Sequence, residues 1–148
     1  MAEDLISLLK DKFHISSIEE QTRCIIVEAR ELKKLCLFLK ENLSFDYLMN
    51  LAAIDYKDKF ALVYVFYSFA SKNRVCLKVF LERSNPSVES IAALYHAADW
   101  HEREAYDVMG INFVGHHHLR RILLPDDWQG HPLRKDYEKE GVVRMPQG

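Results

Sequence analysis

Glycine is missing from most of this chain, and its distribution divides the sequence into two parts. The 148 residues include five glycines, none of which comes before Gly110, and only one of the four prolines, Pro86, precedes that point. Because glycine and proline interrupt helices and strands, we predict a dense body over residues 1–115 and an irregular arm over residues 116–148. The lack of glycine before Gly110 also excludes from that part of the chain the glycine-rich loops that hold dinucleotides and phosphates.

A basic excess and a long apolar run are also missing. Lysine and arginine number 20 against 22 aspartates and glutamates, whereas nucleic-acid binders usually carry a clear excess of basic residues. The longest apolar run, residues 60–70, is far shorter than the ~20 residues that a membrane-spanning helix needs. The N-terminus lacks the apolar segment of a signal peptide. We therefore expect an intracellular protein with no membrane span and no nucleic-acid partner.

Cysteines are few and far apart. Cys24, Cys36 and Cys76 are odd in number and show no C-x-x-C spacing. This pattern predicts thiols in a reducing compartment that pack as small apolar residues, and it argues against an iron–sulfur cluster held by this chain alone.

The pattern of apolar residues in the body predicts an α+β fold. Strands are expected over residues 23–28, 60–69 and 75–81, the last two forming a hairpin. Helices are expected just after an N-cap at Asp4, over residues 32–39, and from an N-cap at Ser87 to about Met109. The order of these elements predicts a small, mostly antiparallel sheet with helices on one face, followed by an extended C-terminal arm.

One carboxylate falls on the apolar face of the last predicted helix. The spacing between Ala98 and Ala105 places Glu102 on that face. Buried carboxylates are rare unless they are paired, and guanidinium groups bind them in a bidentate fork. Candidate partners in the arm are Arg120, Arg121 and Arg134. We favour a structural clamp that pins the arm to the body. The alternative, an acid/base enzyme that uses Glu102 with Glu104, is weakened because residues two apart on a helix point about 200° apart.

The run of three histidines, residues 116–118, does not predict a metal site. Consecutive side chains on an extended segment point to alternate faces, so the three cannot converge on one ion. The zinc-protease helix signature is absent as well, because the second histidine that it would need after His101 is Ala105. We therefore expect no metal ligand here.

The arm combines little periodicity with many large side chains. Its 33 residues mix aliphatic and aromatic residues with arginines, a mixture typical of the centres of protein interfaces. A disordered tail would not keep so many apolar residues. We predict an ordered arm that lies in a groove of another subunit.

Three segments of the sequence resemble a known family. Residues 100–111 (WHEREAYDVMGI) carry the tryptophan, the E-R-E triplet, the aspartate and the Gly-Ile pair of its signature. The match continues through residues 119–123 (LRRIL) and 130–137 (GHPLRKDY). On these motifs the chain resembles the 30 kDa subunit of NADH-quinone oxidoreductase, which is respiratory complex I. Related subunits occur in membrane-bound nickel–iron hydrogenase complexes.

The resemblance implies a non-catalytic subunit of the peripheral arm of a complex that couples electron transfer from NADH to quinone to ion translocation. The alternative is the equivalent scaffold subunit of a hydrogenase or other-donor dehydrogenase complex. The implied partners are the cluster-bearing and quinone-site subunits, on the cytoplasmic side of the bacterial membrane or its organellar equivalent. NADH, FMN, iron–sulfur clusters and quinone are expected in the parent complex, and no cofactor is expected on this chain.

The resemblance also assigns roles to two groups of residues. The implied structural junction between helix and arm consists of Glu102, Arg103, Glu104, Asp107 and Gly110. The implied partner interface consists of Arg120, Arg121, Trp128, His131, Pro132, Arg134, Lys135, Asp136 and Tyr137. No catalytic or metal-ligating residue is implied in either group.

Overall fold

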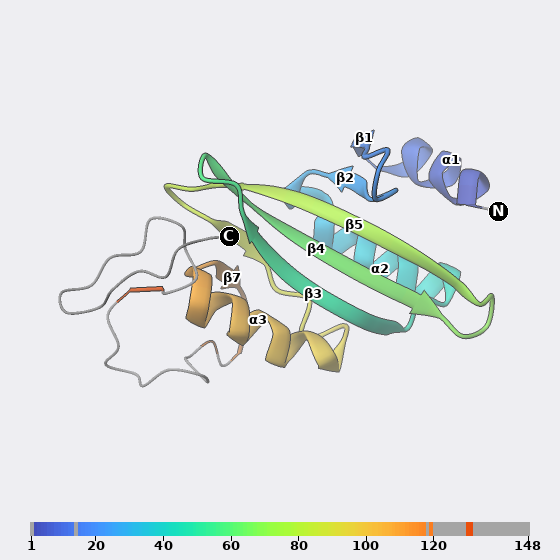
Figure 1. Ribbon diagram of the computed structural model, residues 1–148. Coiled ribbons are helices and arrows are strands. Elements are labelled where there is room, and N and C mark those ends of the chain that lie inside the picture. The colour runs from blue at the N-terminus through green and yellow to red at the C-terminus, as the bar shows by residue number, and fades with distance from the viewer. Residues whose placement is uncertain (1, 14, 118, 120–129, 132–148) are drawn as a thin grey trace.

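An open five-stranded sheet and three helices make up the body of the chain (Figure 1). The computed structural model describes residues 2–13, 15–117, 119, 130 and 131. The elements are α1 (Ala2–Lys12), β1 (Ile15–Ile18), β2 (Ile25–Val27), a short 3-10 turn (Ala29–Glu31), α2 (Leu32–Leu43), β3 (Tyr47–Asp55), β4 (Lys59–Ser68), β5 (Asn73–Glu82), β6 (Ser87–Glu89), α3 (His96–Met109) and β7 (Asn112–Val114). The predicted α+β class is confirmed. None of the helices in the described part of the chain has the length and apolar character needed to cross a membrane.

The sheet is mostly antiparallel, as predicted. Its strand order is β1-β2-β5-β4-β3, and only β2 and β5 run parallel. The predicted hairpin is the β4–β5 pair, which runs from Phe60 opposite Leu81 to Ser68 opposite Asn73. A second, two-stranded sheet pairs β6 with β7 in parallel.

Helices α2 and α3 pack on one face of the large sheet, again as predicted. On β4 this face carries Phe60, Leu62, Tyr64 and Phe66, none of which has exposed surface. The buried side of α2 faces it. From the start of α3, the Tyr95 ring lies 4.9 Å from the Phe66 ring. This layer is the hydrophobic core of the chain.

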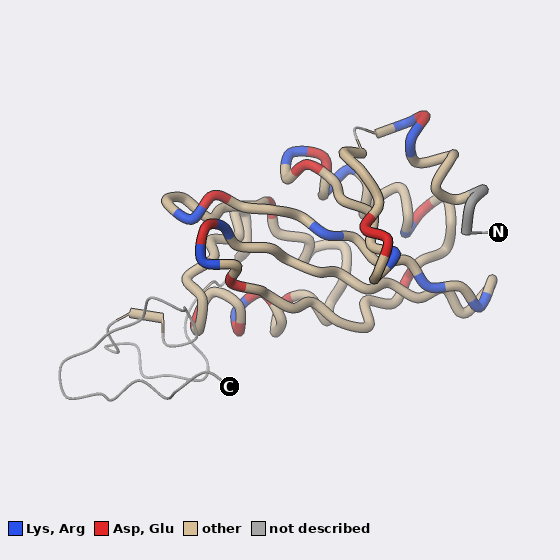
Figure 2. Tube along the Cα trace, turned by 45° about the horizontal axis from the view of Figure 1, so that its top comes forward, with Lys and Arg blue, Asp and Glu red and all other residues tan. Residues whose placement is uncertain are grey.

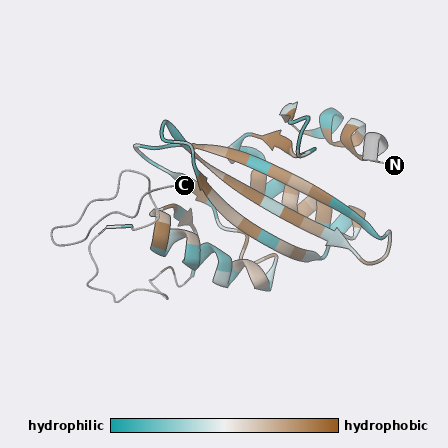
Figure 3. Cartoon of the chain, in the orientation of Figure 1, coloured by the Kyte–Doolittle hydropathy of each residue, from teal (hydrophilic) through white to brown (hydrophobic). Residues whose placement is uncertain are grey.

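The opposite face of the sheet is apolar but only partly buried. Between the core residues of β4, the side chains of Val63, Val65 and Tyr67 are half-exposed, and so are those of Ala52 on β3 and Phe80 on β5. The strands are hydrophobic along most of their length (Figure 3), and charged residues gather mainly in turns and helices (Figure 2). Strands that alternate between apolar and polar residues usually leave a polar face to water, so this apolar face is unusual.

Two predicted helix starts are wrong. Helix α1 begins at Ala2, so the cap predicted at Asp4 falls within its first turn. Helix α3 begins at His96 and not after Ser87, because residues 87–89 form β6. Backbone hydrogen bonds fix this strand: the Ser90 N–H donates to the Val114 carbonyl at 2.8 Å. That pairing joins residues far apart in the sequence, and a local pattern does not reveal it.

Before Gly110, left-handed backbone positions are occupied by residues other than glycine. Arg23, Ser44, Lys57 and Lys72 all have positive φ, between 58° and 77°. Ser44 ends α2, Lys57 lies in the β3–β4 turn, and Lys72 lies in the β4–β5 turn. Because L-residues pay a steric cost in this region, the body carries local strain that glycine would have avoided.

The prediction of separate, reduced cysteines is wrong for two of the three. Cys24 and Cys76 form a disulfide, with 4.6 Å between their Cα atoms and 52 residues between them in the sequence. Parallel pairing of β2 with β5 sets Ile25 opposite Leu77 and therefore brings the preceding residues together. Cys36 is not bonded and is fully buried on α2, as expected for a small apolar residue.

Candidate functional site

The carboxylate of Glu102 closes the loop that leads into α3. It has no exposed surface. The Ser90 hydroxyl donates to Glu102 Oε1 at 2.5 Å, and the Ile91 N–H donates to Oε2 at 2.8 Å. Each carboxylate oxygen therefore has a donor from the segment just before the helix, so Glu102 joins that segment to α3.

Burial raises the pKa of Glu102 to about 7, and the neighbouring charge of Asp99 adds to this effect. The hydrogen bonds from Ser90 and Ile91 act in the opposite direction, because they stabilise the ionised form. Burial and the charge of Glu102 also raise the pKa values of Tyr64 on β4 and Cys36 on α2. The carboxylate thus lies in the core layer between α2, α3 and β4.

His116, the first residue of the predicted arm, is anchored next to the same carboxylate. Its Nε2 atom lies 2.9 Å from Asp99 Oδ1 and 3.9 Å from Glu102 Oε1, and its side chain has no exposed surface. The chain reaches this position from β7 through Gly115, whose φ is +85°. The start of the arm is therefore held against α3 by a buried imidazole.

The last turn of α3 receives a second residue from the arm. The Nδ1 atom of His131 lies 2.9 Å from the backbone oxygen of Asp107, and its ring lies edge-on to Tyr106, with 6.1 Å between ring centroids. Asp107 is fully buried, and Gly110 ends the helix in the left-handed conformation. The arm thus meets α3 at two points, near Asp99 and near Asp107.

The other predicted junction residues lie toward the outside of α3. The Arg103 guanidinium lies over the Trp100 ring at 5.9 Å, and Trp100 is more than half exposed. Glu104 is exposed whereas Glu102 is buried. Because these two carboxylates point in different directions, they do not share a substrate site.

No group of three or more potential metal ligands occurs among the described residues. Of the histidine run, His116 is buried, and His117 is exposed and stacked on it, with 5.1 Å between rings. Most of the predicted interface lies outside the described residues, namely Arg120, Arg121, Trp128, Pro132, Arg134, Lys135, Asp136 and Tyr137. His131 is the one member of that set whose contacts the structure gives.

The family described as "Respiratory-chain NADH dehydrogenase, 30 Kd subunit" matches residues 25–143 of the chain. The chain belongs to this family. An NADH-quinone oxidoreductase subunit of Geotalea uraniireducens is 41% identical over 145 residues, which cover 93% of this chain and 88% of that protein. The corresponding subunit of Geobacter sulfurreducens is 40% identical over 146 residues, with 93% and 90% covered. The resemblance to a complex I-type 30 kDa subunit is confirmed, and these relatives support it over the hydrogenase alternative.

Solved structures show that the fold is shared more widely than the sequence. A trypsin-resistant fragment of Nqo5 aligns with a TM-score of 0.70 at 24% identity, covering 80% of this chain and all of the fragment. A chain of the membrane-bound sulfane sulfur reductase, an archaeal respiratory membrane complex, aligns with a TM-score of 0.72 at 18% identity, covering 99% of this chain and 95% of that one. At these identities the comparison speaks for the fold alone.

Sequence reasoning identified Glu102 but missed the residues that bind it. The sequence favours guanidinium partners from the arm, whereas Ser90, the Ile91 N–H and the nearby His116 lie around the carboxylate. A serine hydroxyl and a backbone N–H leave no charge signal in a sequence. The position of a carboxylate on an apolar helix face was the one signal of this site, and the burial that it predicted is confirmed.

Proposed function

We propose that this family member is a non-catalytic structural subunit of the peripheral arm of a complex I-type NADH:quinone oxidoreductase, which couples electron transfer from NADH to quinone to ion translocation. Its partners are the cluster-bearing and quinone-site subunits, on the cytoplasmic side of the membrane. NADH, FMN, the iron–sulfur clusters and quinone bind to those partners. The names of the relatives support the parent complex, and the shape of this chain supports the structural role.

The outer face of the sheet is the observation that carries this proposal. Helices α2 and α3 cover one face, yet the side chains of β4 on the other face, Val63, Val65 and Tyr67, are also apolar. Strands that are hydrophobic on both faces are normally covered on both. Val63, Val65 and Tyr67 remain half-exposed in the chain alone, and an exposed apolar patch of this kind typically marks a protein interface. We assign the missing cover to a neighbouring subunit.

The junction at α3 supports the same role. The buried side chains of Glu102 and His116 contact Ser90 and Asp99 of the chain itself. Contacts of this type hold the base of the arm, which would carry Arg120, Arg121, Trp128 and Tyr137 toward a neighbour.

A charged residue placed on the outer face of the sheet would test this function. We would replace Val65 by glutamate in an affinity-tagged chain, within the organism that encodes it, and quantify the complex I subunits recovered with the tag. A half-exposed position tolerates a polar residue in the isolated chain, but a carboxylate without a partner is costly in a closed interface. We expect at least about a tenfold loss of recovered subunits, a factor that corresponds to about 1.4 kcal/mol.

Two variants control this experiment. Val65→Thr keeps the shape of the valine side chain and adds a hydroxyl group but no charge. Lys34→Glu introduces a glutamate on the exposed side of α2, away from the outer face. Both should retain normal recovery, and circular dichroism of each purified chain should show an unchanged fold. Normal recovery and quinone reductase activity with Val65→Glu would show that this face does not dock a subunit.

A further inference from the structure

The Cys24–Cys76 disulfide joins two units of the chain that also share a short strand pairing and part of the hydrophobic core. On one side is the N-terminal unit, defined here as α1, β1 and β2; on the other is the β3–β4–β5 meander. Strand β2 pairs with β5 through Ile25 and Ile26 only, in parallel with Leu77 and Lys78. An ion pair adds to this connection, since Lys78 Nζ lies 2.8 Å from Glu19 Oε2. The disulfide therefore adds a covalent cross-link beside a strand pairing of only two residues.

Of the two bonded cysteines, Cys76 lines a pocket. Cys24 is only 4% exposed, whereas Cys76 is partly exposed and lines a cavity of about 390 Å³ between α1, the end of α2 and the first half of β5. β5 is open there because β2 pairs with it only from Leu77 onward. Access to the disulfide is therefore from the Cys76 side.

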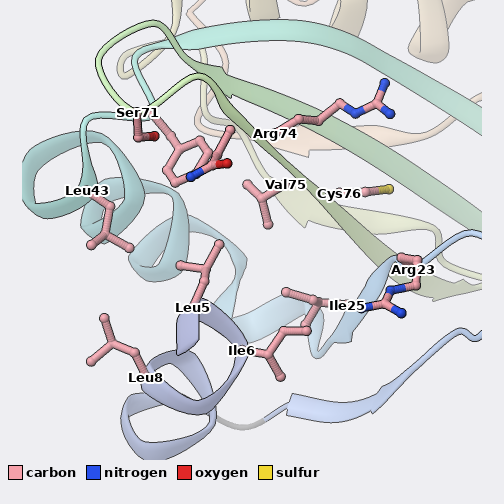
Figure 4. A pocket seen from close by; sticks show the side chains of 12 residues that line it. Leu5, Ile6, Leu8, Arg23, Ile25, Leu43, Ser71, Arg74, Val75 and Cys76 are labelled. Carbon is pink, nitrogen blue, oxygen red and sulfur yellow. The ribbon is translucent and has the colours of Figure 1, made fainter. Parts of the chain in front are cut away.

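Two arginines lie at the same end of this pocket. In the view of Figure 4 the Cys76 sulfur lies between the guanidinium groups of Arg74 and Arg23, while Leu5 and Leu43 line the other end. No carboxylate is among the described residues that line the pocket. Arg23 itself adopts a left-handed conformation with φ of 63°, directly before Cys24. The entrance is thus positive and favours an anionic molecule.

We propose that Cys24 and Cys76 form a redox-active pair that exchanges with small anionic thiols of the glutathione class. In the first step the external thiolate attacks Cys76 Sγ, the Cys24–Cys76 bond breaks, and Cys24 leaves as a thiolate. A second external thiolate then attacks the outer sulfur of the mixed disulfide and releases Cys76 as a thiolate. Two external thiols are oxidised to one disulfide, the protein disulfide is reduced by two electrons, and both protein thiolates can take up protons.

Arg23 and Arg74 have two effects on this exchange. Positive charge beside the sulfurs stabilises the departing thiolate, and a better leaving group speeds the exchange. The same charge raises the local concentration of an anionic thiol relative to a neutral one. Cys36 is an unreactive thiol for comparison. Burial raises the pKa of its thiol, and it does not line the pocket.

Reduction loosens the N-terminal unit. Once the bond is open, this unit is held to β5 by the short β2 pairing, the Lys78–Glu19 ion pair and the packing of α1. The redox state of the pair therefore sets how firmly the N-terminal unit is joined to the sheet.

The test uses the oxidised full-length chain and three thiol reductants that differ in charge: glutathione, 2-mercaptoethanol and cysteamine. Samples are taken over time at constant pH, alkylated in the native state, and analysed by intact mass and peptide mapping. We expect glutathione to open the bond fastest relative to its thiolate concentration, with label on Cys24 and Cys76 and none on Cys36. In the Arg23→Gln/Arg74→Gln double variant the rate ratio of glutathione to 2-mercaptoethanol should fall about threefold or more, whereas Lys34→Gln should leave it unchanged.

Hydrogen exchange reports the structural consequence. Reduction should speed exchange of the β1 and β2 amides at least about tenfold while the β3–β4 amides keep their protection. Three cysteines that alkylate under denaturing conditions after equilibration with oxidised glutathione would overturn the proposal, because no bond would then have formed. A rate ratio that does not respond to the two arginines would overturn the role of the pocket, and unchanged exchange in β1 and β2 would overturn the effect on the N-terminal unit.

Discussion

Ser90 and Glu102, twelve residues apart in the sequence, are joined by a 2.5 Å hydrogen bond from the serine hydroxyl to the carboxylate. The Ala92 N–H in turn donates to the same serine oxygen at 3.1 Å. With the Ile91 N–H on the other carboxylate oxygen, the loop before α3 is closed by one buried side chain of that helix. The position of α3, and with it the base of the arm, depends on this contact.

Removing the Glu102 side chain should destabilise the chain, whereas an amide should substitute for it. In Glu102→Ala the buried Ser90 hydroxyl and Ile91 N–H lose their acceptor and a cavity forms, so unfolding free energy should fall by about 3 kcal/mol. In Glu102→Gln the amide oxygen can accept from the Ile91 N–H and the amide nitrogen can donate to Ser90, so the change should stay within about 1 kcal/mol. Urea unfolding at pH 4.5, where the folded chain keeps Glu102 protonated, measures both. Equal losses for the two variants would contradict the hydrogen-bond assignment.

Stability should decrease as the pH rises through the range set by Glu102. Its pKa is about 7 in the folded chain against an ordinary value of 4.5, so between these values the folded state keeps a proton that the unfolded state releases. The free energy of unfolding should therefore fall by on the order of 3 kcal/mol from pH 4.5 to 7 and be level outside that range. The effect is isolated by measuring the free energy of urea unfolding at each pH and subtracting the value for Glu102→Gln from that for the original chain. Subtraction matters because the lowered pKa of Glu19, caused mainly by its hydrogen bond with Lys78, acts with the opposite sign at lower pH.

Helices α2 and α3 end in the same left-handed conformation but with different residues. Ser44 has φ of 61° and Gly110 has φ of 77°, and each donates its N–H back to the last turn of its helix. Ser44→Gly should raise the free energy of unfolding by about 0.5 kcal/mol, and Gly110→Ala should lower it by about 1 kcal/mol. Ser17→Gly, at an exposed position of β1, is the control and should be destabilising. Thermal unfolding of the three variants checks the signs, and a loss of stability in Ser44→Gly would contradict the strain assigned to this position.

Asp55 and Arg83 form a bidentate ion pair at the end of the sheet opposite the β4–β5 turn. Both carboxylate oxygens accept from the guanidinium, which also lies 4.7 Å from the centre of the Phe60 ring. Asp55 is only 4% exposed. A double-mutant cycle with Asp55→Asn and Arg83→Gln should give a coupling energy of about 2 kcal/mol, measured by urea unfolding. Arg83→Lys should recover little of it, since an ammonium group cannot reproduce the fork, and a coupling near zero would show that solvent screens the pair.

The sequence predicted the parts of the fold that local patterns determine. Alternation on either side of a turn predicted the β4–β5 hairpin, and helical spacing predicted α2 and the buried position of Glu102. Strands β6 and β7 were missed because each has three residues and depends on a partner more than twenty residues away. The disulfide was missed for the same reason, since its cysteines meet only through the parallel β2–β5 pairing.

The partners of Glu102 were also not predictable from local sequence patterns. The buried carboxylate predicted a partner, and arginine was the predicted partner because its guanidinium group binds a carboxylate in a bidentate fork. Ser90 and the Ile91 N–H were invisible because their role depends on the path of the loop before α3. His116 was interpreted as one member of a histidine run, whereas its position next to Asp99 comes from the turn at Gly115.

The parallel pairing of β2 with β5 also determines the order in which the chain can assemble. Strands β3, β4 and β5 follow one another and pair through short turns, whereas Ile25 reaches Leu77 only after the residues between them have been brought together. Contacts between distant residues form slowly because of the entropy of closing long loops. Until β2 arrives, the newly made meander presents the backbone of β5 as an open edge, which is the type of surface on which chains aggregate during synthesis.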